Sequence, residues 1–219
     1  MRVTHAFQSV KADSGDSSLI QPSNWNADHV IEGGALPLQL PIQDGARVGQ
    51  LLEAVSADLI GADTWNGQLV AVPFVAAEAK TWTRVSIYNE TPEAAVNFRL
   101  GIYASGADGL PDALLVDAGE HEFDGASEYI DLTISQALSA DAVYWLGYIS
   151  EDASTAVVSG CGDTEASVNP IGGFFFANAD AGRATGVAKA QAYGALPASF
   201  GAIDEYLFSS PSIWLRTGV

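Results

Sequence analysis

Residues 80–103 read KTWTRVSIYNETPEAAVNFRLGIY, and this stretch decides the fold. Two runs within it, 80–89 and 96–103, alternate between apolar and polar or amphipathic side chains, which is the period of a half-buried β-strand. Further short apolar runs, each bounded by Gly, Pro, Asp or Ser, lie at 68–75, 113–119, 129–134 and 142–150. Strands with one apolar face must be covered by a second sheet. The sequence therefore predicts an all-β domain over residues 46–219, a β-sandwich of jelly-roll type.

Residues 1–45 lack this pattern and are predicted to form an extended N-terminal arm. Short apolar patches are separated there by Gly, Pro, Ser, Asp and Asn, and no helical or strand period holds for long. Large apolar side chains such as Phe7 and Trp25 are rare in a solvated tail, so we expect the arm to lie on a neighbouring surface. Between the arm and the first clear strand, residues 45–58 suit either a helix or a strand.

The charge balance excludes several classes of partner. The chain of 219 residues has 9 basic and 27 acidic side chains, a formal net charge of −18. Such a surface repels phosphate backbones and anionic lipid headgroups at long range, so we expect no nucleic-acid binding and no general attraction to membranes. No apolar run approaches the ~20 residues that a membrane helix needs, so we expect no membrane insertion. It also keeps a protein soluble, which is the simpler interpretation. The single cysteine, Cys161, excludes an intrachain disulfide, and no secretory signal is recognisable.

The sequence carries no recognisable catalytic constellation, so we expect a protein without enzymatic activity and without a cofactor. Its three histidines do not stand at metal-ligand spacing from one another or from Cys161. Nucleophile elbows, phosphate loops and dinucleotide fingerprints are missing from it. No metal site is predicted, although calcium at Asp108 and Asp112, which flank a Gly-rich turn, is an alternative to a solvated acidic loop.

Residues 5–33, HAFQSVKADSGDSSLIQPSNWNADHVIEG, resemble an N-terminal segment common in virion proteins of tailed phages and of phage-derived gene transfer agents. In that segment a run like H-x-F-x-S-x-K-x-D-x-x-D leads into P-S-x-W-N-x-x-H. Pro22, Ser23, Trp25, Asn26 and His29 match the second element. The resemblance implies that the arm attaches the protein to a particle, through residues that include Phe7, Pro22, Trp25, Asn26 and His29.

Residues 98–120, FRLGIYASGADGLPDALLVDAGE, look like β-sandwich modules of phage structural proteins and carbohydrate-binding domains. In these modules R-x-G-I-Y is followed by G-x-P-x-x-L-L and a later Y-W-L, which here begins at Tyr144. Leu110 replaces a smaller linker residue, and Asp112 stands where Gly is commoner. The two resemblances imply a virion protein with an attachment arm and a surface-exposed β-module.

The aromatic and basic side chains of residues 80–103 suggest a saccharide site. If the runs 80–89 and 96–103 pair, alternation places five large side chains on one outer face, opposite the apolar ones. These five are Trp82, Arg84, Tyr88, Arg99 and Tyr103. Aromatic rings stack on sugar C–H faces, and guanidinium groups bind hydroxyls or carboxylates. The same rings also suit the core or a subunit interface of a homo-oligomer.

Two functions follow as expectations. The first is a fibre, spike or tail-tip component that attaches through its arm and contacts host surface polysaccharide. The alternative is a purely structural decoration or adaptor protein of the particle with no receptor role. Both place the protein on a virion surface as a homo-oligomer, with other virion proteins as partners. A polysaccharide depolymerase is the least supported hypothesis, because no two of the 27 acidic residues are recognisable as a catalytic pair of carboxylates.

Overall fold

The structure is a computed structural model that describes residues 58–124, 128–161 and 184–218, together with three two-residue strands before them. The chain divides into two compact units, Met1–Pro41 and Ile42–Val219. In the first unit β1 (Arg2–Val3) pairs antiparallel with β2 (His29–Val30). The predicted attachment residues Phe7, Pro22, Trp25 and Asn26 lie outside the described residues, and His29 is described only as a strand position. The attachment role of the arm and its boundary near residue 45 stay predictions.

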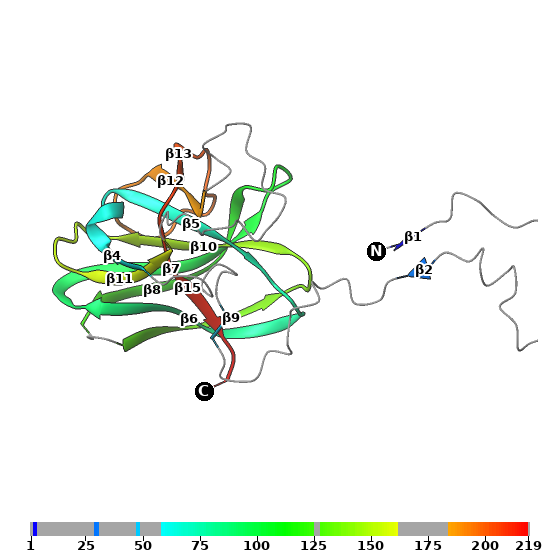
Figure 1. Cartoon of the computed structure of the whole chain (residues 1–219), viewed down its shortest axis with the longest axis horizontal. Coiled ribbons are helices and arrows are strands. Elements are labelled where there is room, and N and C mark those ends of the chain that lie inside the picture. The colour runs from blue at the N-terminus through cyan, green and yellow to red at the C-terminus, as the bar shows by residue number, and fades with distance from the viewer. Residues whose placement is uncertain are drawn as a thin grey trace, which may run out of the picture. The chain divides into compact units, whose positions relative to one another are not determined.

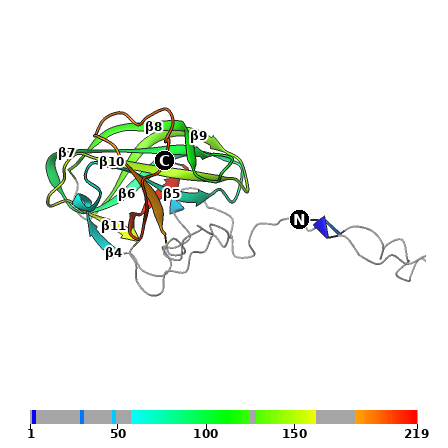
Figure 2. The same ribbon diagram turned by 90° about the horizontal axis from the view of Figure 1, so that it is seen from above.

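The described part of the second unit is a sandwich of two antiparallel sheets, seen from two directions in Figures 1 and 2. The six-stranded sheet has the order β13 (Glu205–Leu207), β12 (Gly186–Ala190), β5 (Gln68–Val75), β10 (Val143–Ser150), β7 (Glu93–Ser105), β8 (Pro111–Phe123). The seven-stranded sheet has the order β14 (Ser210–Pro211), β11 (Val157–Cys161), β6 (Lys80–Thr91), β15 (Ile213–Arg216), β3 (Arg47–Val48), with β9 (Glu128–Leu138) on β6 and β4 (Asp58–Gly61) on β11. The predicted all-β, jelly-roll-like sandwich is confirmed.

The central core fills the space between the sheets. Inward side chains of both sheets build it, among them Val70, Val72 and Phe74 of β5, Phe98, Leu100 and Ile102 of β7, Val85 and Ile87 of β6, and Ile130, Leu132 and Ile134 of β9. Each fully buried aliphatic or Phe side chain contributes about 1.5–3 kcal/mol to stability. The apolar face predicted for residues 96–103 is therefore confirmed at Phe98, Leu100 and Ile102.

The C-terminal strands complete both sheets. β13 forms one edge of the six-stranded sheet, and β15 lies between β6 and β3, where Ile213 faces Ile87 and Leu215 faces Val48. The undecided stretch 45–58 contributes the strand β3, and most of its remainder lies outside the described residues. No helix in the described part is long and apolar enough to span a membrane.

β6 and β7 follow one another in the chain but lie in opposite sheets, so residues 80–89 do not pair with 96–103, and the condition for a shared outer face is not met. β6 pairs with β9, β15 and β11, whereas β7 pairs with β10 and β8. Pro92, which has no N–H to donate to a ladder, stands between the two strands. Ala95 then takes a left-handed conformation with φ 61°. The chain changes sheets at this connection.

A second, smaller core covers the outer face of the six-stranded sheet. Residues 191–204, called the cap here, lie over this sheet and are tied to β8 by hydrogen bonds from Leu114 N to Ala198 O (2.9 Å) and from Phe200 N to Asp112 O (2.7 Å). The buried apolar side chains of this core are Leu69, Ala71, Tyr103, Trp145, Ile149, Val187, Leu196 and Phe200. The outer face of this sheet is thus shielded from solvent around Tyr103.

Gly101 and Gly147 make this close packing feasible. They face each other in the β7–β10 register. A Cβ on Gly101 would stand 2.3 Å from Leu196 Cδ1 and 2.7 Å from Val116 O, and one on Gly147 would stand 2.9 Å from the Tyr103 ring. These distances are too short for any side chain, so the two glycines form the floor on which the cap rests.

Candidate functional site

The five residues predicted to share one outer face are separated by the fold, and Trp82 is not on the surface at all. Trp82 is 0% exposed, belongs to the central core and meets Phe74 edge to face at 5.9 Å. The β6–β9 register shifts between Trp82 and Arg84. The alternation of β6 breaks there, so that Trp82 and Val85, three residues apart, both point inward. The predicted outward position of Trp82 is therefore wrong.

Arg99 and Tyr103 point away from the central core as predicted, but from the six-stranded sheet. Tyr103 is 0% exposed beneath the cap, where its hydroxyl donates to Pro197 O at 3.3 Å and its ring meets Phe200 edge to face at 5.5 Å. Burial raises the pKa of Tyr103. The covered ring has no access to a saccharide, which corrects the prediction.

Arg99 belongs to a polar network that holds the cap in place. Its guanidinium contacts Asp117 Oδ2 at 3.1 Å and Glu120 Oε2 at 3.6 Å. The same two carboxylates also accept hydrogen bonds from the cap, Asp117 from Leu196 N at 3.1 Å and Glu120 from the Tyr193 hydroxyl at 2.8 Å. Burial, followed by the bond to Glu120, raises the pKa of Tyr193. Arg99 therefore positions the cap and is not offered to a ligand.

Arg84 and Tyr88 do lie on an outer face, that of the seven-stranded sheet, and the strands beside them supply side chains that the sequence prediction missed. In the register of β6 with β9 and β15, Tyr88 faces Tyr129, Ser86 stands between Asp131 and Trp214, and Arg84 stands between Thr133 and Arg216. Residues that face each other across a ladder present their side chains on the same side of the sheet. We call these eight residues the β9–β6–β15 face.

Aromatic side chains gather at one end of this face. Tyr88 and Tyr129 meet edge to face at 5.0 Å, and Tyr129 meets Trp214 edge to face at 5.2 Å. Ser86 stands on the strand between them, and its small side chain leaves room for the rings of β9 and β15 to meet. Trp214 is 6% exposed and Tyr129 is 41% exposed. Tyr129 thus offers a ring to solvent that its two neighbours hold in position.

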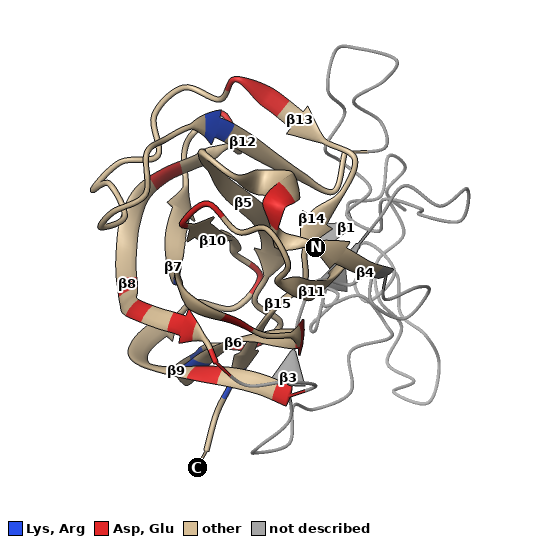
Figure 3. Ribbon diagram, turned by 90° about the vertical axis from the view of Figure 1, so that its left-hand side faces the viewer, with Lys and Arg blue, Asp and Glu red and all other residues tan. Residues whose placement is uncertain are grey.

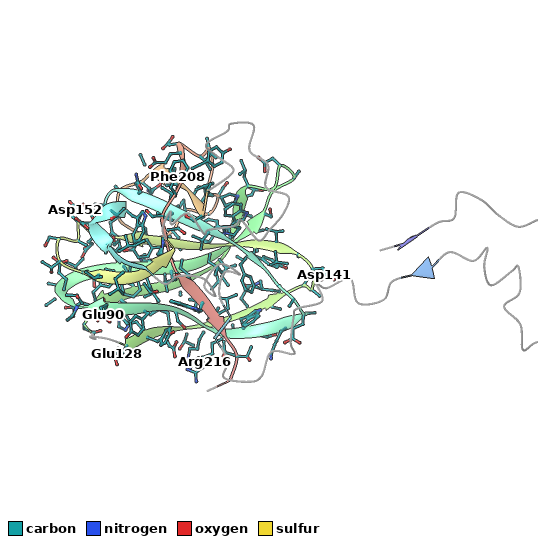
Figure 4. All side chains as sticks on the ribbon, in the orientation of Figure 1. Glu90, Glu128, Asp141, Asp152, Phe208 and Arg216 are labelled. Carbon is teal, nitrogen blue, oxygen red and sulfur yellow. The ribbon has the colours of Figure 1, made fainter. Side chains whose placement is uncertain are left out.

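The other end of the face is polar and positively charged. Asp131 accepts a hydrogen bond from Ser86 Oγ through one carboxylate oxygen and contacts Arg216 Nη1 at 2.8 Å through the other. Arg216, labelled in Figure 4, projects from the end of β15. Arg84 is half-buried and donates from Nη1 to Thr83 O at 2.8 Å. Two guanidinium groups and an ordered carboxylate therefore lie on the same face as the rings, towards its other end.

Part of this face is predictable from the alternation of the sequence alone. Residues 129–134 were recognised as a strand, and their period places Tyr129, Asp131 and Thr133 on one side. The run that contains Trp214 and Arg216 is short and apolar, and nothing local assigns it to the neighbourhood of β6. The missing information was strand pairing, which is a long-range property.

A separate cleft of about 470 Å³ lies where the β7–β8 turn meets the cap. Asp108 and Asp112, the residues considered for calcium, line it together with Gly201 and Ile203. Asp108 Oδ1 accepts a hydrogen bond from Leu110 N at 3.1 Å, and Asp112 Oδ1 accepts one from Ser199 Oγ at 3.3 Å. Among the described residues no group of three or more His, Cys, Asp or Glu side chains is placed to hold a metal ion.

The β9–β6–β15 face is the arrangement best suited to binding in the described part of the chain. Its rings favour contact with the C–H faces of a sugar, and its guanidinium groups favour hydroxyl or carboxylate oxygens. The carboxylate of Asp131 is held in position by Ser86 and Arg216, which suits it to accept hydrogen bonds. Comparisons with protein-family models, with curated proteins and with solved structures give no match.

Proposed function

We propose that this chain is a non-enzymatic surface protein of a phage-type particle, and that it binds host polysaccharide through the β9–β6–β15 face. The observation that carries the binding role is the half-exposed ring of Tyr129, held between Tyr88 and Trp214. The resemblances of residues 5–33 and 98–120 support the particle context. In this proposal residues 1–45 attach the protein to other virion proteins.

One exposed ring and a few hydrogen bonds make a weak saccharide site. Weak sites become effective when many copies act together, because each binding event after the first is intramolecular. A homo-oligomer displayed repeatedly on a particle supplies this multiplicity. The proposal therefore expects weak binding by the isolated chain and strong adsorption by the particle.

The proposal is tested by replacing the exposed ring. We expect Tyr129→Ala to weaken binding to host surface polysaccharide at least about tenfold, a change of about 1.4 kcal/mol, because the stacking surface is lost. The melting temperature should change little, since Tyr129 is 41% exposed and leaves no closed cavity. Leu59→Ala is the matched control, because Leu59 is 58% exposed and lies on β4. Titration calorimetry and glycan arrays measure both variants.

The purely structural alternative is favoured by one observation, the burial of Trp214. With Trp214 6% exposed, much of the aromatic surface is already covered, as expected of side chains that brace a sheet. A decoration or adaptor protein would need nothing more from this face. If Tyr129→Ala lowers the melting temperature strongly while polysaccharide binding by the particle is unchanged, the structural role replaces the receptor role.

A further inference from the structure

Within the part of the chain that the structure describes, Arg84 is a guanidinium without a carboxylate partner, although the protein is strongly acidic. Among the described basic side chains, Lys80 contacts Glu78, Arg99 contacts Asp117 and Glu120, and Arg216 contacts Asp131. For Arg84 the described residues supply a single hydrogen-bond acceptor, the Thr83 carbonyl oxygen. A guanidinium has five N–H donors, so most of its capacity is left for another group.

The neighbours of Arg84 add positive charge where cross-strand pairing would ordinarily avoid it. Arg84 of β6 faces Arg216 of β15, and Arg216 in turn faces the register position of Arg47 in β3. Like charges that face each other across strands destabilise a sheet. Asp131 offsets part of this cost, but both of its oxygens already have partners. With 9 basic residues in the whole chain, the facing pair Arg84 and Arg216 is a concentration of positive charge that a bound anion would relieve.

The arginine pair and the exposed ring are a short distance apart on the same face. Arg84 and Tyr88 are four positions apart on β6, which corresponds to about 13 Å at the rise of a β-strand. Tyr129 faces Tyr88 on the next strand. A ligand that covers both ends of the face is therefore longer than a single sugar ring, and its anionic group lies at one end.

We propose that the β9–β6–β15 face recognises an acidic saccharide, whose carboxylate binds Arg84 while a neighbouring sugar ring stacks on Tyr129. This inference rests on the proposed saccharide function and names its ligand class. The planar fork of arginine matches a carboxylate in a bidentate geometry, which a neutral hydroxyl cannot reproduce.

The net charge of −18 sharpens this recognition instead of preventing it. At physiological ionic strength charges are screened beyond about 8 Å, so the cations of the face act only on a ligand already in contact. Polyanions that do not fit the face meet an acidic surface elsewhere and are repelled. Figure 3 shows acidic residues along β8, which lies in the other sheet and agrees with such a surface. Rejecting the wrong partners contributes to specificity as much as attracting the right one.

The experiment compares acidic polysaccharides with their neutralised forms. Polygalacturonate, alginate and hyaluronate are immobilised, each beside its carboxyl-reduced counterpart, and the full chain is presented as a tetramer to supply avidity. We expect at least about tenfold tighter binding to the acidic form of the bound polysaccharide. Arg84→Gln should abolish that preference without weakening binding to the reduced form, and Arg84→Lys should restore only part of it, because the fork is lost.

Lys189→Gln is the matched control, since it removes a cation on the six-stranded sheet, where Lys189 lies over the Phe200 ring at 5.5 Å. It should leave the preference unchanged. Equal binding to acidic and reduced forms, with sensitivity to Tyr129→Ala, overturns the acidic class and leaves the saccharide function standing. Acid-selective binding that survives Arg84→Gln also overturns the inference. Binding to none of the six forms overturns both the inference and the proposed function. Melting temperatures of all variants show whether each is folded.

Discussion

At the scale of single residues, Glu93 shows how one half-buried carboxylate fastens a loop. It accepts hydrogen bonds from Ser154 N and Oγ, Thr155 N and Ala156 N, at 2.6 to 2.9 Å. These bonds, with that from the Ser154 side chain the largest cause, lower the pKa of Glu93 to about 2. The β10–β11 loop is thereby tied to the connection at which the chain changes sheets.

The Glu93 contribution to stability should therefore depend on pH. Its carboxyl has a lower pKa in the folded state than the usual 4.5, so its stabilising effect is fully present above about pH 4.5 and is lost as the pH falls towards 2. We expect Glu93→Gln to lower the melting temperature at pH 7 and to converge with the unmodified protein near pH 2. Glu128→Gln, an exposed carboxylate on β9, is the control. Equal melting curves at pH 7 for Glu93→Gln and Glu128→Gln would contradict this role.

Side-chain orientation was predictable from the sequence wherever the strand is regular. In β7 the inward Phe98, Leu100 and Ile102 and the opposite orientation of Arg99 and Tyr103 follow from alternation alone. In β6 the same reasoning failed at Trp82, because the register shift before Arg84 moves every earlier side chain to the other face. Such irregularities depend on the partner strand, so the period of one strand does not reveal them.

At the scale of secondary-structure elements, the cap depends on the glycine floor beneath it. We expect Gly101→Ala to destabilise the protein by about 1–3 kcal/mol, because the new methyl group overlaps Leu196 and the Val116 carbonyl. Gly194→Ala is the control, since a Cβ there meets nothing within 4 Å. Denaturant unfolding measures both, and hydrogen exchange of residues 191–204 reports on the cap. An unchanged midpoint for Gly101→Ala would show that the cap is not closely packed.

The pairing of elements was less predictable than the elements themselves. The sequence predicted the strands at 80–89, 96–103 and 129–134, but it suggested that the first two pair with each other. An alternating run indicates which side chains are buried together, and it says nothing about which sheet the strand joins. The sequence therefore predicts only Arg84 and Tyr88 as members of the β9–β6–β15 face. The strand register of the structure adds Tyr129, Trp214 and Arg216.

At the scale of the whole molecule, we expect the sandwich to fold without the arm and the arm to serve particle attachment. The sandwich contains its own central core and both sheets within the unit Ile42–Val219. We expect deletion of residues 1–45 to leave a folded, β-rich protein that no longer joins particles, because the deletion removes the segment that resembles virion attachment segments. Far-ultraviolet circular dichroism and particle composition by gel electrophoresis measure the two properties. Normal incorporation of the shortened chain would rule out the arm as the attachment element.

The position of β15 has a consequence for the order in which the protein can be made and folded. β6 and β3 are synthesised early, but the strand that lies between them is synthesised more than a hundred residues later. Until residue 216 has left the ribosome, the edge of β6 is open and Val85 and Ile87 lack part of their cover. Folding dominated by such distant pairings is slow, and open strand edges invite aggregation. The nascent chain therefore passes through a vulnerable interval, in which its acidic surface charge keeps copies apart.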